Sequence, residues 1–290
     1  MVAVVCGVLA VPTLGAAPAA HAQNAIEYAL IVAALANTGG FNDTTPPAIT
    51  LTTPADGATY APGQQVTADY ACTDAGVTAM NAVATATGQT LDALLAIFAE
   101  HGADLGHPAC DGPVPSGAAI DTSPGAHAFT LTARDLAFTI APDSNGDGAP
   151  DVIPQPNTAT VTTHYTVAYA FNGFRAPVAN PPGVNPVKAG QAVPIKFSLG
   201  GDRGLGILPS TPTSGPTDCT HGPAGAPLPA VPAGAPVSAV PAGNRGLQYD
   251  AASDTYTWVW KTDSAWKGTC RTLTVALDDG ITHAAYFAFK

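Results

Sequence analysis

Turn-forming residues interrupt this chain so often that long helices cannot dominate its fold. The sequence has 30 glycines and 28 prolines among its 290 residues. Both residue types favour turns and weaken helix interiors and central strands. Between them lie short threonine-rich runs, such as HAFTLTARD at 127–135 and TATVTTHYTVAYAF at 158–171, in which apolar side chains alternate. This period of two predicts a mainly β fold of two antiparallel β-sandwich domains.

The first 22 residues have the pattern of an export signal. An apolar run from Val2 to Leu14 leads to Ala20-His21-Ala22, which is typical of a cleavage site. No Lys or Arg precedes the run, which departs from the usual signal, and a buried N-terminal helix is the alternative. We expect a signal peptide at 1–22, a secreted mature chain from Gln23, and no later membrane span.

The charge balance limits the partners that the chain can have. Acidic residues outnumber basic ones by 21 to 10, which gives a formal net charge of -11. Such a surface repels phosphate backbones, and no cluster of Lys or Arg interleaved with aromatics stands out. We therefore expect no nucleic-acid partner, and instead an extracellular polymer, a glycan or a cell-envelope component.

Four cysteines would remain after removal of the signal: Cys72, Cys110, Cys219 and Cys270. An even number in an exported chain favours disulfides, although the sequence allows three pairings. We favour Cys72–Cys110 and Cys219–Cys270, because each pair then lies inside one proposed domain. A zinc site is the competing interpretation, and it lacks a C-x-x-C knuckle.

Two segments of the first domain read as helix. Residues 25–36 form a short apolar helix within a 23–45 linker, and an insertion at about 77–106 has apolar residues three and four apart, with a break at Gly88. We expect the two to pack together as a helical cap, because both need cover for apolar faces. These faces comprise Tyr28, Leu30, Ile31 and Leu35 in the first segment and Met80, Val83, Leu91, Leu94, Leu95 and Phe98 in the second.

An acidic loop at about 136–156 carries the best candidate metal site. Asp143, Asn145, Asp147 and Asp151 stand at positions 1, 3, 5 and 9 of a segment with Gly146 at position 6. Alternate oxygen side chains on a tight turn suit calcium, so we predict a calcium site here. The bidentate Glu of position 12 is replaced by Pro154. The alternative is a surface turn rich in Asp and Asn.

The segment 171–290 resembles the PxKF domain, a module of exported bacterial proteins. The resemblance depends on Pro194-Ile195-Lys196-Phe197 within NPVKAGQAVPIKFSLGGDRGLGI, and on LQYDAASDTYTWVWKTDSAWKGTCRTLTVALDDG further on. The region 46–170 resembles bacterial immunoglobulin-like repeats through PPAITLTTPADGATYAPGQQVTADYACTD, although its helical insertion and acidic loop depart from them. The resemblance implies two immunoglobulin-like β-sandwiches with an accessory role, with Pro194, Lys196 and Phe197 as the family motif.

Other candidate residues have a structural and a functional interpretation. Tyr256, Trp258, Trp260 and Trp266 suit either a sandwich core, which we favour, or stacking on sugar rings. The spacing of His101 and His107 fits no common metal motif, which favours a surface pair.

We expect a secreted accessory or binding module, active in surface binding, adhesion or spacing and without its own catalytic centre. The alternatives are a small secreted hydrolase, with its site in the insertions of the first domain, and a fragment of a larger gene product.

Overall fold

The computed structural model describes residues 28, 30–34, 43–144, 146, 150–218, 236–241 and 246–290. Most of the elements are β-strands, which confirms a mainly β fold. The chain divides into two compact units, residues 1–50, 70–112 and 131–161 and residues 51–69, 113–130 and 162–290. The predicted boundary between residues 170 and 171 lies inside the second unit, so the division into domains at 46–170 and 171–290 stays a prediction. The predicted signal peptide, residues 1–22, lies outside the described residues.

Two helices form where the sequence predicted a helical insertion. α2 spans Ala75–Thr87 and α3 spans Leu91–Glu100. The Asp74 side chain begins α2 by accepting a hydrogen bond from the Val77 amide at 3.0 Å. Gly88 ends it with φ at 72°, in the left-handed region that glycine enters without strain. The predicted break at Gly88 is confirmed.

The helical cap is also confirmed. Residues 28 and 30–34 are helical, and Tyr28 and Ile31 are buried against α2 and α3. Leu30 was assigned wrongly, because it lies on the opposite helix face and is 63% exposed; Leu35 lies outside the described residues. The buried members of this core are Tyr28, Ile31, Val32, Met80, Val83, Ala84, Leu94, Leu95, Phe98, Ala103, Leu105, Leu136, Phe138 and Val152.

A disulfide closes the helical insertion. Cys72 lies on β3 (Asp69–Thr73), which pairs with β1 (Ala48–Thr53). Cys110 lies on β4 (Ala109–Asp111), which pairs antiparallel with β5 (Gly125–Arg134). The two cysteines are bonded, with Cα atoms 5.7 Å apart, as predicted. The two strands that flank the helices are thus covalently joined.

The acidic segment 136–156 is more regular than predicted. β6 (Phe138–Ala141) and β7 (Asp151–Pro154) pair antiparallel within it. The description of this segment as a loop was therefore wrong at its two ends. Phe138 and Val152 are buried in the helical core, and this burial stabilises a pairing that the short, proline-interrupted sequence did not indicate.

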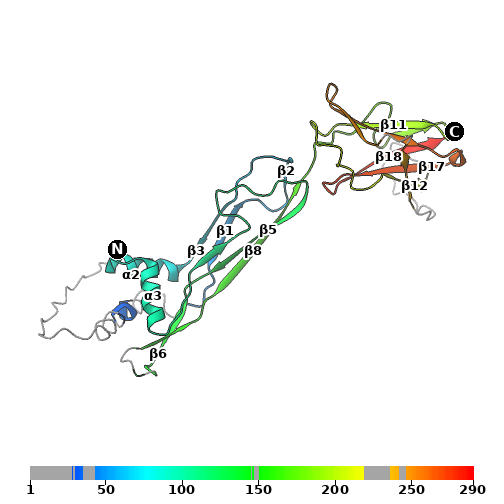
Figure 1. Cartoon of the computed structure of the whole chain (residues 1–290). Helices are drawn as coiled ribbons and strands as arrows, with labels where there is room; N and C mark the ends of the chain where they lie inside the picture. The colour runs from blue at the N-terminus through cyan, green and yellow to red at the C-terminus, as the bar shows by residue number, and fades with distance from the viewer. Residues whose placement is uncertain are drawn as a thin grey trace, which may run out of the picture. The chain divides into compact units, whose positions relative to one another are not determined.

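A four-stranded sheet has the order β2-β8-β5-β4, with β2 at Ala58–Tyr60 and β8 at Thr158–Val167. β5 and β8 are the two long strands that run side by side in Figure 1. Their predicted alternation is confirmed at Phe129, Leu131 and Ala133 and at Thr163, Tyr165 and Val167, which are buried. It was wrong at Val161, which we expected on the same face and which is 36% exposed. β2 runs parallel to β8, which departs from a purely antiparallel fold.

The segment 174–289 forms two more sheets. The order of the first is β10-β18-β17-β12-β13, and that of the second is β14-β16-β11-β9, with β15 beside β16. β10 and β18 pair in parallel. The strands are β9 (Phe174–Arg175), β10 (Val184–Val187), β11 (Ala192–Phe197), β12 (Thr213–Thr217), β13 (Val237–Ser238), β14 (Val240–Pro241), β15 (Gln248–Asp250), β16 (Thr255–Lys261), β17 (Cys270–Ala276) and β18 (Thr282–Phe289).

Side chains of both sheets share one core. β11 and β16 contribute Ile195, Phe197 and Trp260, and β17 and β18 contribute Leu273 and Phe287, all buried. The chain also crosses between the sheets, because β13 pairs with β12 in one sheet and β14 pairs with β16 in the other. Ala239, between these strands, is fully buried, and its amide donates to the Pro212 carbonyl at 2.7 Å.

No single described helix is long and apolar enough to cross a membrane. α2 and α3 meet the length and composition criteria only when taken together, and they are bent by 95° at their junction.

Candidate functional site

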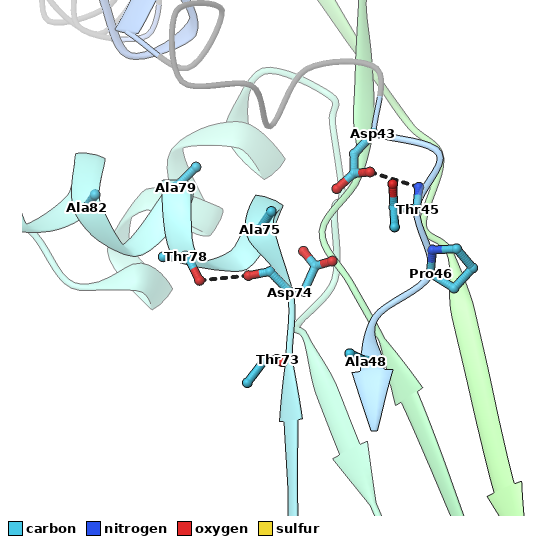
Figure 2. A pocket seen from close by; sticks show the side chains of 10 residues that line it. All are labelled: Asp43, Thr45, Pro46, Ala48, Thr73, Asp74, Ala75, Thr78, Ala79 and Ala82. Atoms are coloured by element: carbon cyan, nitrogen blue, oxygen red, sulfur yellow. Dashed lines mark hydrogen bonds between the residues drawn. The ribbon is translucent and has the colours of Figure 1, made fainter. Parts of the chain in front are cut away.

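An open groove lies at the start of α2. It has a volume of about 930 Å³ and is lined by the segment that leads into β1 and by the first turns of the helix. Figure 2 shows the carboxylates of Asp43 and Asp74 facing one another across the gap between these segments. Asp43 stands before β1, and Asp74 stands at the junction of β3 and α2. The groove therefore brings together carboxylates from distant parts of the sequence.

A third carboxylate, Asp135, completes a cluster. One oxygen from each of Asp43, Asp74 and Asp135 lies within 4.8 Å of the others. Two oxygens on opposite sides of a calcium ion are separated by about 4.8 Å, because each bond is about 2.4 Å. Asp135 is fully buried, whereas Asp43 and Asp74 are half-buried. The spacing suits a hard cation, so the hydrogen bonds of each carboxylate decide how the cluster is interpreted.

Asp135 is occupied by protein donors. Its Oδ1 accepts from the backbone amides of Ala137 at 3.1 Å and Asn157 at 2.7 Å, and its Oδ2 accepts from Asn157 Nδ2 at 2.8 Å. Asn157 Nδ2 also donates to the Asp43 carbonyl at 3.0 Å. Asp135 and Asn157 together thus join three segments: the chain after β5, the start of β8 and the entry to β1.

Asp43 and Asp74 also have local partners. Asp43 Oδ1 accepts from the Thr45 amide at 2.8 Å, and Asp74 Oδ1 caps α2 through the Val77 amide. A Cβ on Gly76 would lie 3.1 Å from Asp74 Oδ1 and 3.6 Å from Asp43 Oδ2. Glycine therefore lets the first turn of α2 approach both carboxylates, and the positive end of the helix dipole stabilises them there. These bonds assign the three aspartates to anchoring the helical cap, and the cluster carries no metal assignment.

The predicted calcium loop is described only in part. Asp143 Oδ1 accepts from the Gly146 amide at 2.6 Å, and Asp151 Oδ2 accepts from the Ser144 amide at 3.0 Å and from the Ser144 hydroxyl. Asp151 opens β7. Asn145 and Asp147 lie outside the described residues, so calcium binding here stays a prediction.

Comparison of the chain with family models, with curated proteins and with solved structures gives no match. The resemblance to PxKF and immunoglobulin-like modules therefore stays a prediction, and the functional argument depends on the geometry of this chain.

The residues of the predicted PxKF motif lie on β11. Phe197 is buried in the core, and Lys196 pairs in register with Arg175 of β9 and Thr257 of β16. β9 covers only the last two residues of β11, so Pro194 occupies a position where the strand has a single neighbour. A proline is tolerated at such a position, because no second neighbouring strand needs a hydrogen bond from its backbone amide.

Of the second predicted disulfide, Cys219–Cys270, only Cys270 lies among the described residues. Cys270 is disulfide-bonded and buried. Its predicted partner, Cys219, lies outside the described residues.

The aromatic residues divide between core and surface. Tyr256, Trp258 and Trp260 are buried, as we favoured, whereas Trp266 is partly exposed and lines a second groove. His101 stacks on Tyr28, with ring centroids 4.1 Å apart, and His107 lies 3.4 Å from Asp92 on the surface. The expected surface pair is therefore correct only for His107, which is exposed, because His101 is half-buried against Tyr28.

Sequence reasoning missed the aspartate cluster. Asp43, Asp74 and Asp135 have no shared spacing, and each belongs to a different turn or strand end. Only Asp74 carried a recognisable pattern, because it precedes the helical periodicity as an N-cap residue.

Proposed function

We propose that this protein is exported and acts outside the cytoplasm as an accessory module that binds a surface or polymer, without catalysis of its own. The observation that carries the proposal is the Cys72–Cys110 disulfide. Disulfides persist in oxidising compartments and are rare in the bacterial cytoplasm. The bond joins β3 to β4 at the base of the helical insertion, so it stabilises a feature of this fold.

The two sheets of residues 174–289 support an immunoglobulin-like sandwich of the PxKF type. They enclose a single aromatic core, and β11, which contains Pro194 to Phe197, lies between β16 and β9. Such sandwiches present loops and edges as binding surfaces and leave the fold itself unchanged. This architecture supports the proposal of an accessory role for a chain outside the cell.

The alternative, a small secreted hydrolase, would place its site in the insertions of the first domain. There, Asp135 is buried and has three protein hydrogen bonds, and Asp74 caps a helix. Groups held in this way serve the fold, so we prefer the accessory role.

Expression of the full chain in a bacterium, followed by fractionation, tests the proposal. We expect processed protein that starts at Gln23 outside the cytoplasm, fully oxidised, and cosedimenting with cell-envelope polymers. Reduced and unprocessed protein in the cytoplasm would contradict export. Oxidised protein that fails to sediment with any envelope fraction would contradict the binding role.

A further inference from the structure

A second groove lies at one end of the 174–289 sheets. It has a volume of about 660 Å³ and is lined by Gly190, Ser238, Lys261, Asp263, Ser264 and Trp266, among others. Trp266 ends a short 3-10 helix, Ser264–Trp266, between β16 and β17. The groove therefore combines an indole ring with hydroxyl, carboxylate and ammonium groups.

Backbone hydrogen bonds bring the segments around this groove to one end of the sheets. The Thr262 amide donates to the Gln191 carbonyl at 3.3 Å, and the Gly268 amide donates to the Phe289 carbonyl at 2.8 Å. Lys188, Lys261 and Lys267 belong to these segments and are all exposed. Three lysines thus lie at the same end of these sheets: Lys188 between β10 and β11, Lys261 at the end of β16, and Lys267 after the 3-10 helix.

This concentration of positive charge is unusual for the chain. The sequence has ten Lys and Arg residues in all and a net charge of -11. Five of the ten lie at this end: Lys188, Lys261, Lys267, Arg271 and Lys290. Within the described part of the chain, none of these lysines forms an ion pair, whereas Arg271 interacts electrostatically with Asp263, the acidic residue that lines the groove. Unpaired cations on an acidic protein create a local field that attracts anions.

Arg271 fixes the indole ring. Its guanidinium carbon lies 4.2 Å from the centre of the Trp266 ring. Its Nε donates to Ser214 Oγ at 2.9 Å, and a terminal nitrogen donates to the Ser214 carbonyl at 2.8 Å. Both Arg271 and Ser214 are buried. The stacked cation restricts the ring, which reduces the side-chain entropy that Trp266 would lose on binding a ligand.

The mixture of groups favours an acidic sugar polymer. Aromatic rings pack on the apolar faces of sugars, and the side chains of Ser238, Ser264 and Asp263 offer hydrogen bonds to hydroxyls. The lysines suit carboxylates, through charge-assisted hydrogen bonds. A polyuronate has a lower linear charge density than double-stranded DNA, which suits a protein whose overall charge repels dense polyanions.

We propose that the Trp266 groove binds an acidic polysaccharide of the polyuronate type. The inference deepens the proposed function, on which it rests, by naming the class of polymer and the residues that contact it.

The test is affinity electrophoresis of the full oxidised chain in gels with polygalacturonate, alginate or neutral dextran. We expect retardation by the two polyuronates, reversed by salt, and none by dextran. Changing both Lys261→Gln and Lys267→Gln should weaken polyuronate binding by about fivefold or more, since exposed ionic contacts are individually weak. Trp266→Phe should weaken binding to polyuronate without changing its salt dependence.

The matched control changes Thr158→Glu and Thr160→Glu, two exposed residues of β8. This control variant lowers the net charge by two units, as the double lysine variant does, and should leave polyuronate binding unchanged. Equal losses in both double variants would overturn the groove assignment. Absence of polyuronate retardation, or stronger binding to single-stranded DNA or to anionic lipid vesicles, would overturn the ligand class. If the protein cosediments with the envelope but does not bind polyuronates, the proposed function is supported and only the assignment of a polyuronate ligand is wrong.

Discussion

The ring of Tyr28 meets the ring of Phe98 edge to face, with centroids 5.5 Å apart and planes at 74°. This contact joins the N-terminal helical residues to α3 and places both rings in the helical core. A side chain more than forty positions upstream of the disulfide therefore helps to cover the segment that the disulfide closes.

Tyr28→Ala should destabilise the first unit by about 3–5 kcal/mol, the range for truncating a large buried aromatic residue. Leu30→Ala, in the same helix but largely exposed, should change stability by less than about 0.5 kcal/mol. Urea denaturation followed by circular dichroism measures both. Equal effects of the two changes would show that the helix is a tether with no part in the core.

The mature chain should contain no free thiol, because Cys72 and Cys110 are bonded and Cys270 is also in a disulfide. Thiol titration in denaturant without reductant checks this directly. Replacing both Cys72 and Cys110 by Ser should cost about 4 kcal/mol, from the entropy gained by the opened loop in the unfolded chain. Two or more reactive thiols in the wild-type protein would contradict the pairing and weaken the argument for export.

Asp135→Ala should be the most harmful change in the aspartate cluster. It leaves the amides of Ala137 and Asn157 without their acceptor in a buried site, where each lost bond costs about 1–3 kcal/mol. Asp74→Ala removes a helix cap and should cost about 1 kcal/mol. Melting in calcium and in chelator supplies the control: if calcium stabilises the wild type but not Asp135→Ala, the cluster is a cation site and the anchoring role is wrong.

Calcium should stabilise the protein through the Asp143 loop. At a concentration one hundred times its dissociation constant, a ligand of the folded state adds about 2.7 kcal/mol. Changing Asp143 and Asp147 to Ala should abolish the calcium-dependent rise in melting temperature, whereas Asp69→Ala, at an exposed position on β3, should preserve it. Identical melting of the wild type in calcium and chelator would leave the loop as a surface turn.

Asp254 should make the stability of the second unit depend on pH. The Ser198 hydroxyl donates to its Oδ2 at 2.5 Å and the Tyr249 hydroxyl to its Oδ1 at 3.0 Å. The bond from Ser198 is the main cause that lowers the pKa of Asp254 below its ordinary value of 3.8. The pKa of Asp254 is lower in the folded protein than in the unfolded chain. The ionised carboxylate therefore stabilises the fold at pH values above the unfolded pKa, and this stabilisation is lost as the pH falls through the folded pKa.

Asp254→Asn tests this relationship, because Asn tolerates the positive φ of 45° at this position. The variant should be less stable than the wild type at pH 7, and the difference should shrink as the pH falls to about 2. A carboxyl titration followed by NMR should show the pKa rise in Ser198→Ala. A stability difference that is constant across this pH range would contradict the assignment.

Local patterns predicted the elements of this fold better than their assembly. The break at Gly88 and the alternation in β5 follow from backbone freedom and burial, which act over a few residues. The β6–β7 hairpin escaped prediction because it depends on a core formed by Tyr28, Phe98 and Leu136, which are distant in sequence. The same limit applies to the Trp266 groove, whose lysines come from the β10–β11 and β16–β17 connections, which are distant in sequence and are brought together by long-range backbone hydrogen bonds.

The crossing at Ala239 has a mechanical consequence. β13 is paired with one sheet and β14 with the other, and the residue between them is fixed in the core. A force that slides the two sheets past one another must therefore break both ladders together and expose Ala239 to water. The crossing therefore couples the two sheets mechanically, so that a load applied to one of them is carried in part by the other.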